Sequence, residues 1–282
     1  MTKFKETAMQ AVFFLTACVS IAAVLLICVY LLGNGIPTIF EIGLENFFGH
    51  TWKPSQDLYG IFPFIIGSIY VTAGAMVVGV PIGILCAVFL ARFCPKGLYR
   101  VLNPAVQLMA GIPSIVYGFF GLMVIVPLVQ ELTGSSGKGM LTASLLLGIM
   151  ILPTIIGTAE PALRAVPQAY YEGSLALGAT HERSTFSAIL PAAKSGVLSG
   201  VILGVGRAIG ETMAVIMIAG NQPRMPGGLL DGLRTMTSNI VLEMGYSTGL
   251  HRQALIATGV VLFVFILLIN TCFSLVKRKE KA

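Results

Sequence analysis

The sequence predicts an all-α protein that crosses a membrane six times. Charged residues make up 11% of the chain and hydrophobic residues 56%, whereas about a quarter of the residues in soluble domains are charged. Six apolar runs are long enough to cross a bilayer as helices, which takes about 20 residues each. They cover residues 9–32, 63–90, 106–129, 140–157, 197–218 and 254–276. No segment between them is long enough for a separate domain, so residues 1–282 are predicted to form one transmembrane domain.

The first four runs differ in how regular a helix they predict. The run at 9–32 is too long for the apolar core of a cleaved signal peptide, and we expect it to remain as a helix. The second run contains Pro81 and the third contains Pro113. Proline removes a backbone hydrogen bond and favours a kink or break, and broken helices often line transport sites. For the third run, a functional break and a simple kink both remain open, and the fourth run is the shortest.

The distribution of basic residues predicts the orientation of the chain. Lysine and arginine concentrate in the two end segments, including Lys3, Lys5 and residues 277–281, and in the loops after the second and fourth runs. The positive-inside rule then puts both termini in the cytoplasm. The net charge of +6 comes largely from this bias, so nucleic-acid binding is not predicted. The five cysteines form no CxxC pair and the three histidines are scattered, so no metal site is predicted.

The two longer outer loops, 33–62 and 219–253, are each expected to contain a short helix, near 36–48 and 233–244. Trp52 is expected at the level of the lipid headgroups. These loops are either ordinary surface or a docking face for an external partner.

The fifth run contains Arg207 and Glu211, its only charged residues. An ionised side chain at mid-bilayer costs about 3 kcal/mol on insertion scales and usually faces a protein interior or an aqueous path. At about 100° per residue, Gly196, Gly200, Gly204 and the two charged residues fall within an arc of about 80°. Glycines at this spacing let another helix approach closely. The charges are therefore predicted on the packed side of the helix, where something polar or anionic passes or is held.

The cytoplasmic loop at 158–195 is too short for an enzyme domain. It predicts two short helices, at 168–177 and 182–190, separated by Gly178 as a glycine cap. The second helix is expected to stop before Pro191. Such a pair of helices protruding from the membrane is a feature that another protein could grip.

This loop resembles the EAA signature of ATP-binding cassette (ABC) importer permeases. In that pattern, Glu-Ala-Ala is followed by a glycine and then by Ile-x-Leu-Pro. Here Glu172 opens the motif, Gly178 has the matching spacing and Leu190-Pro191 closes it. The chain departs from the pattern at Gly173-Ser174, which replaces Ala-Ala, and at Ala188, which stands where isoleucine is usual.

Three further segments resemble the permeases of phosphate importers: GIPSIVYGFFGL at 111–122, LGAT at 177–180 and GVGRAIGETMAV at 204–215. The GETMAV ending is more similar to PstC than to PstA permeases. The resemblance implies a type I importer permease (MetI-like) fold in a bacterial cytoplasmic (inner) membrane. It implies as partners a homologous PstA-like permease, two copies of a cytoplasmic ATP-binding subunit and an external phosphate-binding protein. The residues that it implies for ATPase coupling are Glu172, Gly173, Gly178, Ala179, Leu190 and Pro191.

For Arg207 and Glu211, two interpretations remain open. They form an intrahelical ion pair, or Arg207 contributes positive potential to a phosphate path, since a guanidinium binds phosphate oxygens through two parallel hydrogen bonds. Glu211 would then compensate that charge and accept a hydrogen bond from a protonated phosphate. Thr212 is a weaker candidate, because a hydroxyl in a span often bonds its own backbone.

The chain is not expected to be an enzyme or to hold a cofactor, so the partner ATPase would use the ATP. The nearest lookalike of a phosphate-binding loop, GSSGKGM at 134–140, has Leu132 where the first glycine is needed and Gly139 after the lysine. An importer for another oxyanion, such as sulfate or molybdate, is the alternative. A self-contained carrier is disfavoured, because no second intramembrane acid or histidine is present for a proton relay.

Overall fold

The computed structural model describes the backbone of residues 2–279 and the side chains of residues 6–272 and 275. Lys281, and the side chains of Lys3, Lys5 and residues 277–279, lie outside the described part of the chain. The predicted orientation in the membrane therefore remains a prediction.

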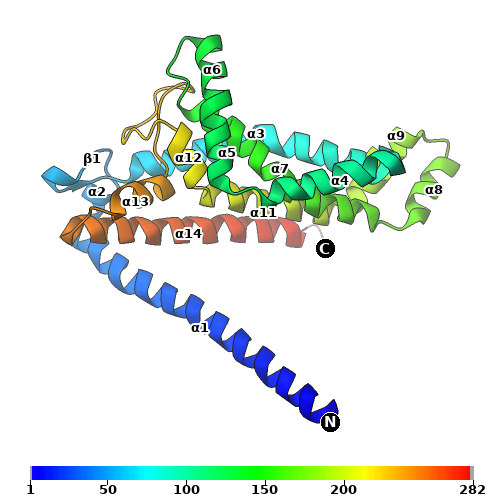
Figure 1. Cartoon of the computed structure of the whole chain (residues 1–282), viewed down its shortest axis with the longest axis horizontal. Helices are drawn as coiled ribbons and strands as arrows, with labels where there is room; N and C mark the ends of the chain where they lie inside the picture. The colour runs from blue at the N-terminus through cyan, green and yellow to red at the C-terminus, as the bar shows by residue number, and fades with distance from the viewer. Residues whose placement is uncertain (1, 280–282) are drawn as a thin grey trace.

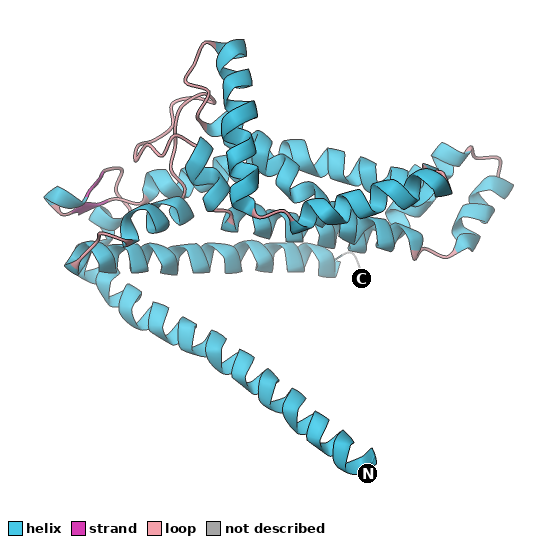
Figure 2. Ribbon diagram, viewed as in Figure 1, coloured by secondary structure: helices cyan, strands magenta, loops and turns pink. Residues whose placement is uncertain are grey.

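Helices make up most of the described structure, joined by loops and accompanied by one small hairpin (Figure 2). The first half of the chain forms α1 (Thr2–Ile42), α2 (Leu44–Phe47), β1 (Trp52–Lys53), η1 (Pro54–Gln56), β2 (Leu58–Tyr59), α3 (Phe62–Val88), η2 (Phe89–Phe93), α4 (Lys96–Gly111), α5 (Ser114–Phe120), η3 (Gly121–Ile125) and α6 (Val126–Thr133). The second half forms α7 (Met140–Arg164), α8 (Gln168–Ala176), α9 (His181–Ser184), η4 (Thr185–Ile189), α10 (Leu190–Ala192), α11 (Lys194–Gly210), α12 (Met213–Ile218), α13 (Met236–Met244) and α14 (Gly249–Lys279). Three of the short segments, η2, η3 and η4, are π-helical turns.

The count of spans agrees with the sequence prediction. Within the described residues, five helices are long and apolar enough to cross a bilayer, and a sixth is reached if the bent pair His181–Ala192 and Lys194–Gly210 counts as one span. The two helices of that pair meet at 72°.

Several predicted boundaries are wrong, including that of the fifth run, whose helix α11 ends at Gly210. The first helix continues to Ile42, well beyond residue 32. The third run breaks at Ile112-Pro113, so that its spanning part is Ser114–Thr133 while α4 forms a separate amphipathic helix before the break. The fourth run continues to Arg164, because Pro161 removes only one hydrogen bond of α7 and the turns around it are held by buried Ala159 and Leu163. The loop that the sequence predicts to be cytoplasmic is correspondingly shorter than expected.

The centre of the molecule is α7, which packs against α3 and α11. The backbones of α3 and α7 approach closely at Gly79 and Gly148: a Cβ atom added at Gly79 would lie 2.7 Å from the Gly148 carbonyl oxygen. Leu146 and Ile151 of α7 are fully buried in this contact region. Small residues at the interface and dense side-chain packing are the usual basis of helix association in lipid.

The two ends of the bundle have different characters (Figure 1). The hairpin β1–β2, α2 and α13 gather at one end, the β1 end, and α8 and α9 form the other, the α8 end. The helices α1 and α14 meet at the β1 end, from which α14 runs along the bundle toward the α8 end (Figure 1). They are in contact near Gly35 and Val260, beyond which α1 diverges from the bundle.

The loop helices at the β1 end match the prediction in part. The helix expected near 233–244 is α13. The helix expected near 36–48 is the last part of α1 followed by the single turn of α2. Trp52 is buried within the protein, with 4% of its surface exposed.

Candidate substrate path and coupling site

The fifth apolar run is broken at its acidic residue. The helix α11 ends at Gly210, Glu211 has extended backbone angles (φ −69°, ψ 131°), and α12 begins at Met213. The Glu211 carboxylate turns toward the second helix and accepts a hydrogen bond of 3.2 Å from the backbone N–H of Ala214. A carboxylate is stabilised there by the unpaired N–H groups of a helix start.

Arg207 lies in the last turn of α11 and points to α7. Its Nη1 donates a hydrogen bond of 3.3 Å to Oγ1 of Thr154. The glycines predicted on the same face also meet α7, with Gly196 against Ala162 and Gly200 against Ile155. The predicted packed face of this helix is therefore confirmed.

Of the two interpretations of Arg207 and Glu211, the intrahelical ion pair is not formed. No ion pair joins them among the described side chains, because the helix ends at Gly210 and the acid no longer lies one turn above the arginine on a continuous helix. Thr212 bonds its own backbone, as the weaker interpretation of it predicts: Oγ1 donates to the Gly210 carbonyl at 3.1 Å.

At the α8 end, the first half of the motif forms an exposed helix with a glycine cap. Glu172 and Gly173 are exposed on α8. Gly178 has a left-handed backbone (φ 83°), as the sequence predicts for a glycine at this helix end. The following N–H, of Ala179, donates to the Ser174 carbonyl at 3.2 Å.

The second half of the motif forms one continuous helical segment. It begins at His181 and runs through η4 to Ala192, so the expectation that it stops before Pro191 is wrong. Pro191 is the second residue of α10, just after the π-helical turn η4. Leu190 packs partly buried against the core at this end, while Pro191 is exposed.

The surface of this helical pair is unusually apolar. Tyr170, Leu175 and Leu177 are exposed around α8, and Leu177 has 91% of its surface exposed. Such a patch indicates an interaction surface. Hydrogen bonds to its own backbone N–H and to Thr180 lower the pKa of Glu182, so that this exposed acid beside the patch stays ionised.

An aromatic contact ties the helical pair to the end of α3. The Tyr171 hydroxyl lies 2.8 Å from Nδ1 of His181, and the His181 ring is 4.5 Å from the ring of Phe93 in η2. A displacement of α8 or α9 would therefore press on η2.

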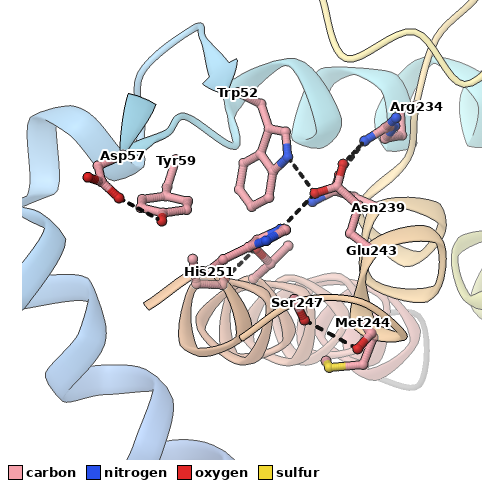
Figure 3. A network of polar contacts seen from close by, with 11 residues as sticks. Trp52, Asp57, Tyr59, Arg234, Asn239, Glu243, Met244, Ser247 and His251 are labelled. Carbon is pink, nitrogen blue, oxygen red and sulfur yellow. Dashed lines mark hydrogen bonds and ion pairs between the residues drawn. The ribbon is translucent and has the colours of Figure 1, made fainter. Parts of the chain in front are cut away.

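A polar cluster missed by the sequence reasoning is buried at the β1 end (Figure 3). We call Trp52, Arg234, Glu243 and His251 the Glu243 cluster. The Glu243 carboxylate, 6% exposed, accepts from Trp52 Nε1 at 2.9 Å and from Arg234 Nη1 at 2.5 Å, and lies 2.8 Å from His251 Nε2. It thereby joins the two loops of this end. Beside it, burial and then the hydrogen bond to Asp57 raise the pKa of Tyr59, so that its hydroxyl stays protonated.

A second polar cluster, also missed, lies toward the α8 end. Glu160 of α7, 6% exposed, pairs with Arg164 and accepts a hydrogen bond of 3.2 Å from the Tyr99 hydroxyl of α4. The only sequence signal was an acid followed four residues later by an arginine, in a segment that the prediction placed in a loop.

The fold and these features define a class, the multi-span helical permeases of membranes. The chain matches the family described as binding-protein-dependent transport system inner membrane component over residues 79–281. It is 37% identical to a probable ABC transporter permease protein, YqgH, of Bacillus subtilis, covering 90% of this chain and 87% of that protein. It is 34% identical to the phosphate transport system permease protein PstC of Pasteurella multocida, covering 79% of this chain and 76% of that protein. The chain therefore belongs to the family of binding-protein-dependent transport system inner membrane components.

The fold agrees with this membership. A chain of the MetNI methionine ABC transporter, in an inward-facing form, superposes with a TM-score of 0.58 at 22% identity, covering 82% of this chain and 99% of the other. The type I, MetI-like architecture predicted from the sequence is therefore confirmed.

Proposed function

We propose that this chain is the transmembrane permease subunit of an ABC importer for inorganic phosphate, and that Arg207 lies on the phosphate path. The observation that carries the proposal is the state of the Arg207 guanidinium. It sits in a bundle of apolar helices, and within the described residues its one hydrogen-bond partner is Thr154. A guanidinium has five N–H donors, so most of them remain free to bind oxyanion oxygens. The relative PstC of Pasteurella multocida, named as a phosphate transport permease, supports the choice of substrate.

Glu211 acts in this proposal as the acceptor for a protonated phosphate oxygen. Its carboxylate is held by one backbone N–H of α12 and is not neutralised by Arg207. A carboxylate repels an anion unless that anion donates a hydrogen bond to it, and phosphate at neutral pH carries such a proton. Thr212 lies at the break, and its hydroxyl already donates a hydrogen bond to the Gly210 carbonyl. In this proposal it therefore supports the shape of the break.

The helical pair at the α8 end is proposed as the contact with the ATPase. Glu172, Gly173, Gly178, Ala179, Leu190 and Pro191 would form or support this contact, and the exposed Leu177 and Tyr170 would supply its apolar area. In this proposal, two copies of a cytoplasmic ATP-binding subunit use the ATP, and this chain is not an enzyme and needs no cofactor. The other partners are a homologous PstA-like permease and an external phosphate-binding protein. The membrane is the bacterial cytoplasmic (inner) membrane, with both termini in the cytoplasm.

The test is uptake of labelled phosphate in phosphate-starved cells with and without this chain, with other phosphate systems deleted. We expect phosphate uptake to depend on the chain, and excess unlabelled phosphate to compete while sulfate and molybdate do not. Competition by sulfate or molybdate, with no dependence of phosphate uptake on the chain, would contradict the proposed substrate and favour another oxyanion.

The proposed ATPase contact has its own test. Glu172→Lys reverses a charge on the exposed helix α8. We expect it either to uncouple ATP hydrolysis from uptake in the assembled complex or to prevent copurification of the ATPase. Normal uptake together with normal copurification would contradict the assignment of this contact.

A further inference from the structure

The structure contains a polar cavity between α4 and α7 that neither the family match nor the motifs assign. Its volume is about 420 Å³, enough for a small hydrated anion. We call it the α4–α7 cavity. From α4 it is lined by Tyr99, Asn103 and Gln107, which are four residues apart and therefore share one face of that helix. The amphipathic character of α4 thus has a specific consequence: its polar face lines this cavity.

The wall contributed by α7 has one charged side chain, Glu160. Pro153, Ile156, Gly157 and Pro161 line the rest of it. Because Pro161 has no N–H, the Gly157 carbonyl lacks its normal helical partner and is left as an acceptor. Asn103 is half-buried and Gln107 is exposed, and among the described residues no hydrogen bond to either side-chain amide is formed. These amides and the freed carbonyl are therefore available to water or to a polar ligand in the cavity.

One end of the α4–α7 cavity lies beside Arg207. Pro153 and Ala110 line this end, and Thr154, the next residue, accepts the hydrogen bond from Arg207. The guanidinium is also within electrostatic range of Tyr117, whose hydroxyl donates to the Met109 carbonyl at 2.9 Å across the α4–α5 break.

At the other end lie Tyr99 and Glu160, which Arg164 joins, and we call these three residues the Tyr99 plug. The Tyr99 hydroxyl donates to Glu160, and the Arg164 guanidinium stacks over the Tyr99 ring at 4.3 Å. Arg164 is fixed in turn to η2, because its Nη2 donates to the Leu90 carbonyl at 2.7 Å. Since η2 also holds Phe93 against His181, the plug and the proposed ATPase contact are attached to the same short segment.

We propose that the α4–α7 cavity is the cytoplasmic part of the passage for a protonated oxyanion, and that the Tyr99 plug closes its cytoplasmic end. This inference rests on the proposed path at Arg207. Asn103 and Gln107 donate hydrogen bonds to the oxyanion, and the freed Gly157 carbonyl accepts one from its hydroxyl. Because Arg164 pairs with Glu160, the walls carry little net charge, which suits brief passage better than tight binding.

The experiment places single cysteines in the assembled transporter, in a background whose native cysteines are replaced by alanine. Asn103→Cys and Gln107→Cys face the cavity, and Leu108→Cys, on the exposed apolar side of α4, is the matched control. Inside-out vesicles are treated with a charged, membrane-impermeant thiol reagent. Apolar surroundings slow the control reaction about tenfold for each unit by which they raise its thiol pKa. Because of this higher thiol pKa at position 108, we expect positions 103 and 107 to react at least about tenfold faster than position 108. Inorganic phosphate should slow the reactions at positions 103 and 107.

Two further measurements make the outcomes distinct. Tyr99→Ala should open the plug and speed labelling at position 103, whereas Tyr30→Ala, on exposed α1, should leave it unchanged. Labelling at 103 and 107 that is no faster than at 108, or that no oxyanion slows, would overturn this inference even if phosphate uptake depends on the chain. Protection by sulfate and not by phosphate would overturn the proposed substrate and leave the passage in place.

Discussion

The hydroxyl of Thr237, at the start of α13, donates a hydrogen bond of 3.2 Å to the backbone carbonyl of Glu211. The Glu211 carbonyl would be paired inside a continuous helix, but here it belongs to the extended residue at the break. Thr237 is itself held by a contact of 3.0 Å with the Thr235 hydroxyl, next to Arg234 of the Glu243 cluster. The β1 end of the molecule is thereby attached to the acidic residue of the proposed path.

Thr237→Val should slow phosphate uptake by the assembled importer. Valine fills nearly the same volume but leaves the Glu211 carbonyl without its donor, and a net hydrogen bond is worth about 1 kcal/mol, or about fivefold in the fraction of correctly formed breaks. Initial uptake rates in vesicles measure the effect. Thr237→Ser keeps the hydroxyl and should behave as wild type. Equal rates for the valine and serine variants would show that this bond does not position Glu211.

Gly178→Ala should weaken the proposed ATPase contact. Nothing lies within 4 Å of a Cβ added at this residue, so the cost comes from its left-handed backbone (φ 83°), about 1–2 kcal/mol for a residue with a side chain. Gly97→Ala is the control, because the added carbon also meets nothing within 4 Å but lies in the helical backbone of α4, outside the proposed contact. Copurification of the ATPase with each variant is the measurement. A loss with Gly97→Ala as large as with Gly178→Ala would contradict the backbone explanation.

Adding one methyl group at Gly196 should weaken the packing of α11 against α7. A Cβ added there overlaps the Cβ of Ala162, so Gly196→Ala should destabilise the protein by about 1–3 kcal/mol, as overpacking does. Thermal unfolding in detergent tests this. Gly206→Ala lies on the same helix with nothing within 4 Å of the added carbon and should be tolerated. Adding Ala162→Gly to Gly196→Ala should restore much of the loss, and a double variant no better than the single one would argue against this contact.

Glu243→Gln should lower the thermal stability of the protein. Removing one member of a buried ion pair costs about 3–5 kcal/mol, because the other charge remains buried; here that charge is on Arg234, whose Nη1 lies 2.5 Å from Glu243. Glu45→Gln changes an exposed acid of α2 and should have little effect. An unchanged unfolding midpoint for Glu243→Gln would mean that the Glu243 cluster does not hold the two loops together.

The sequence predicted the parts of this structure that depend on local pattern. Apolar length predicted the spans, and the four-residue spacing of Gly196, Gly200 and Gly204 predicted the face that packs on α7, because helical periodicity determines it. The same periodicity misled at Glu211, since it assumes a helix that continues past Gly210. Glycine at that position, with its low helix propensity, was the available signal for the break.

The contacts that join distant segments could not be predicted in this way. Trp52 and Glu243 are 191 positions apart, and no local pattern relates them. Glu160 was assigned to a loop because the apolar run ends at residue 157, whereas packing of α7 against α3 and α11 carries the helix to Arg164. The α4–α7 cavity depends on the continuation of α7 past Glu160 and on the break before α5. Only the structure therefore reveals it.

The most direct test of the proposed path is a comparison of Arg207→Ala with wild type in the complete importer reconstituted into vesicles. Phosphate uptake and ATP hydrolysis are measured in the same preparation. Arg224→Ala, which removes an exposed arginine of the loop before α13, is the control. We predict that Arg207→Ala abolishes uptake while the assembled ATPase still hydrolyses ATP, and that the control variant transports normally. Phosphate uptake by Arg207→Ala at the wild-type rate would contradict the account.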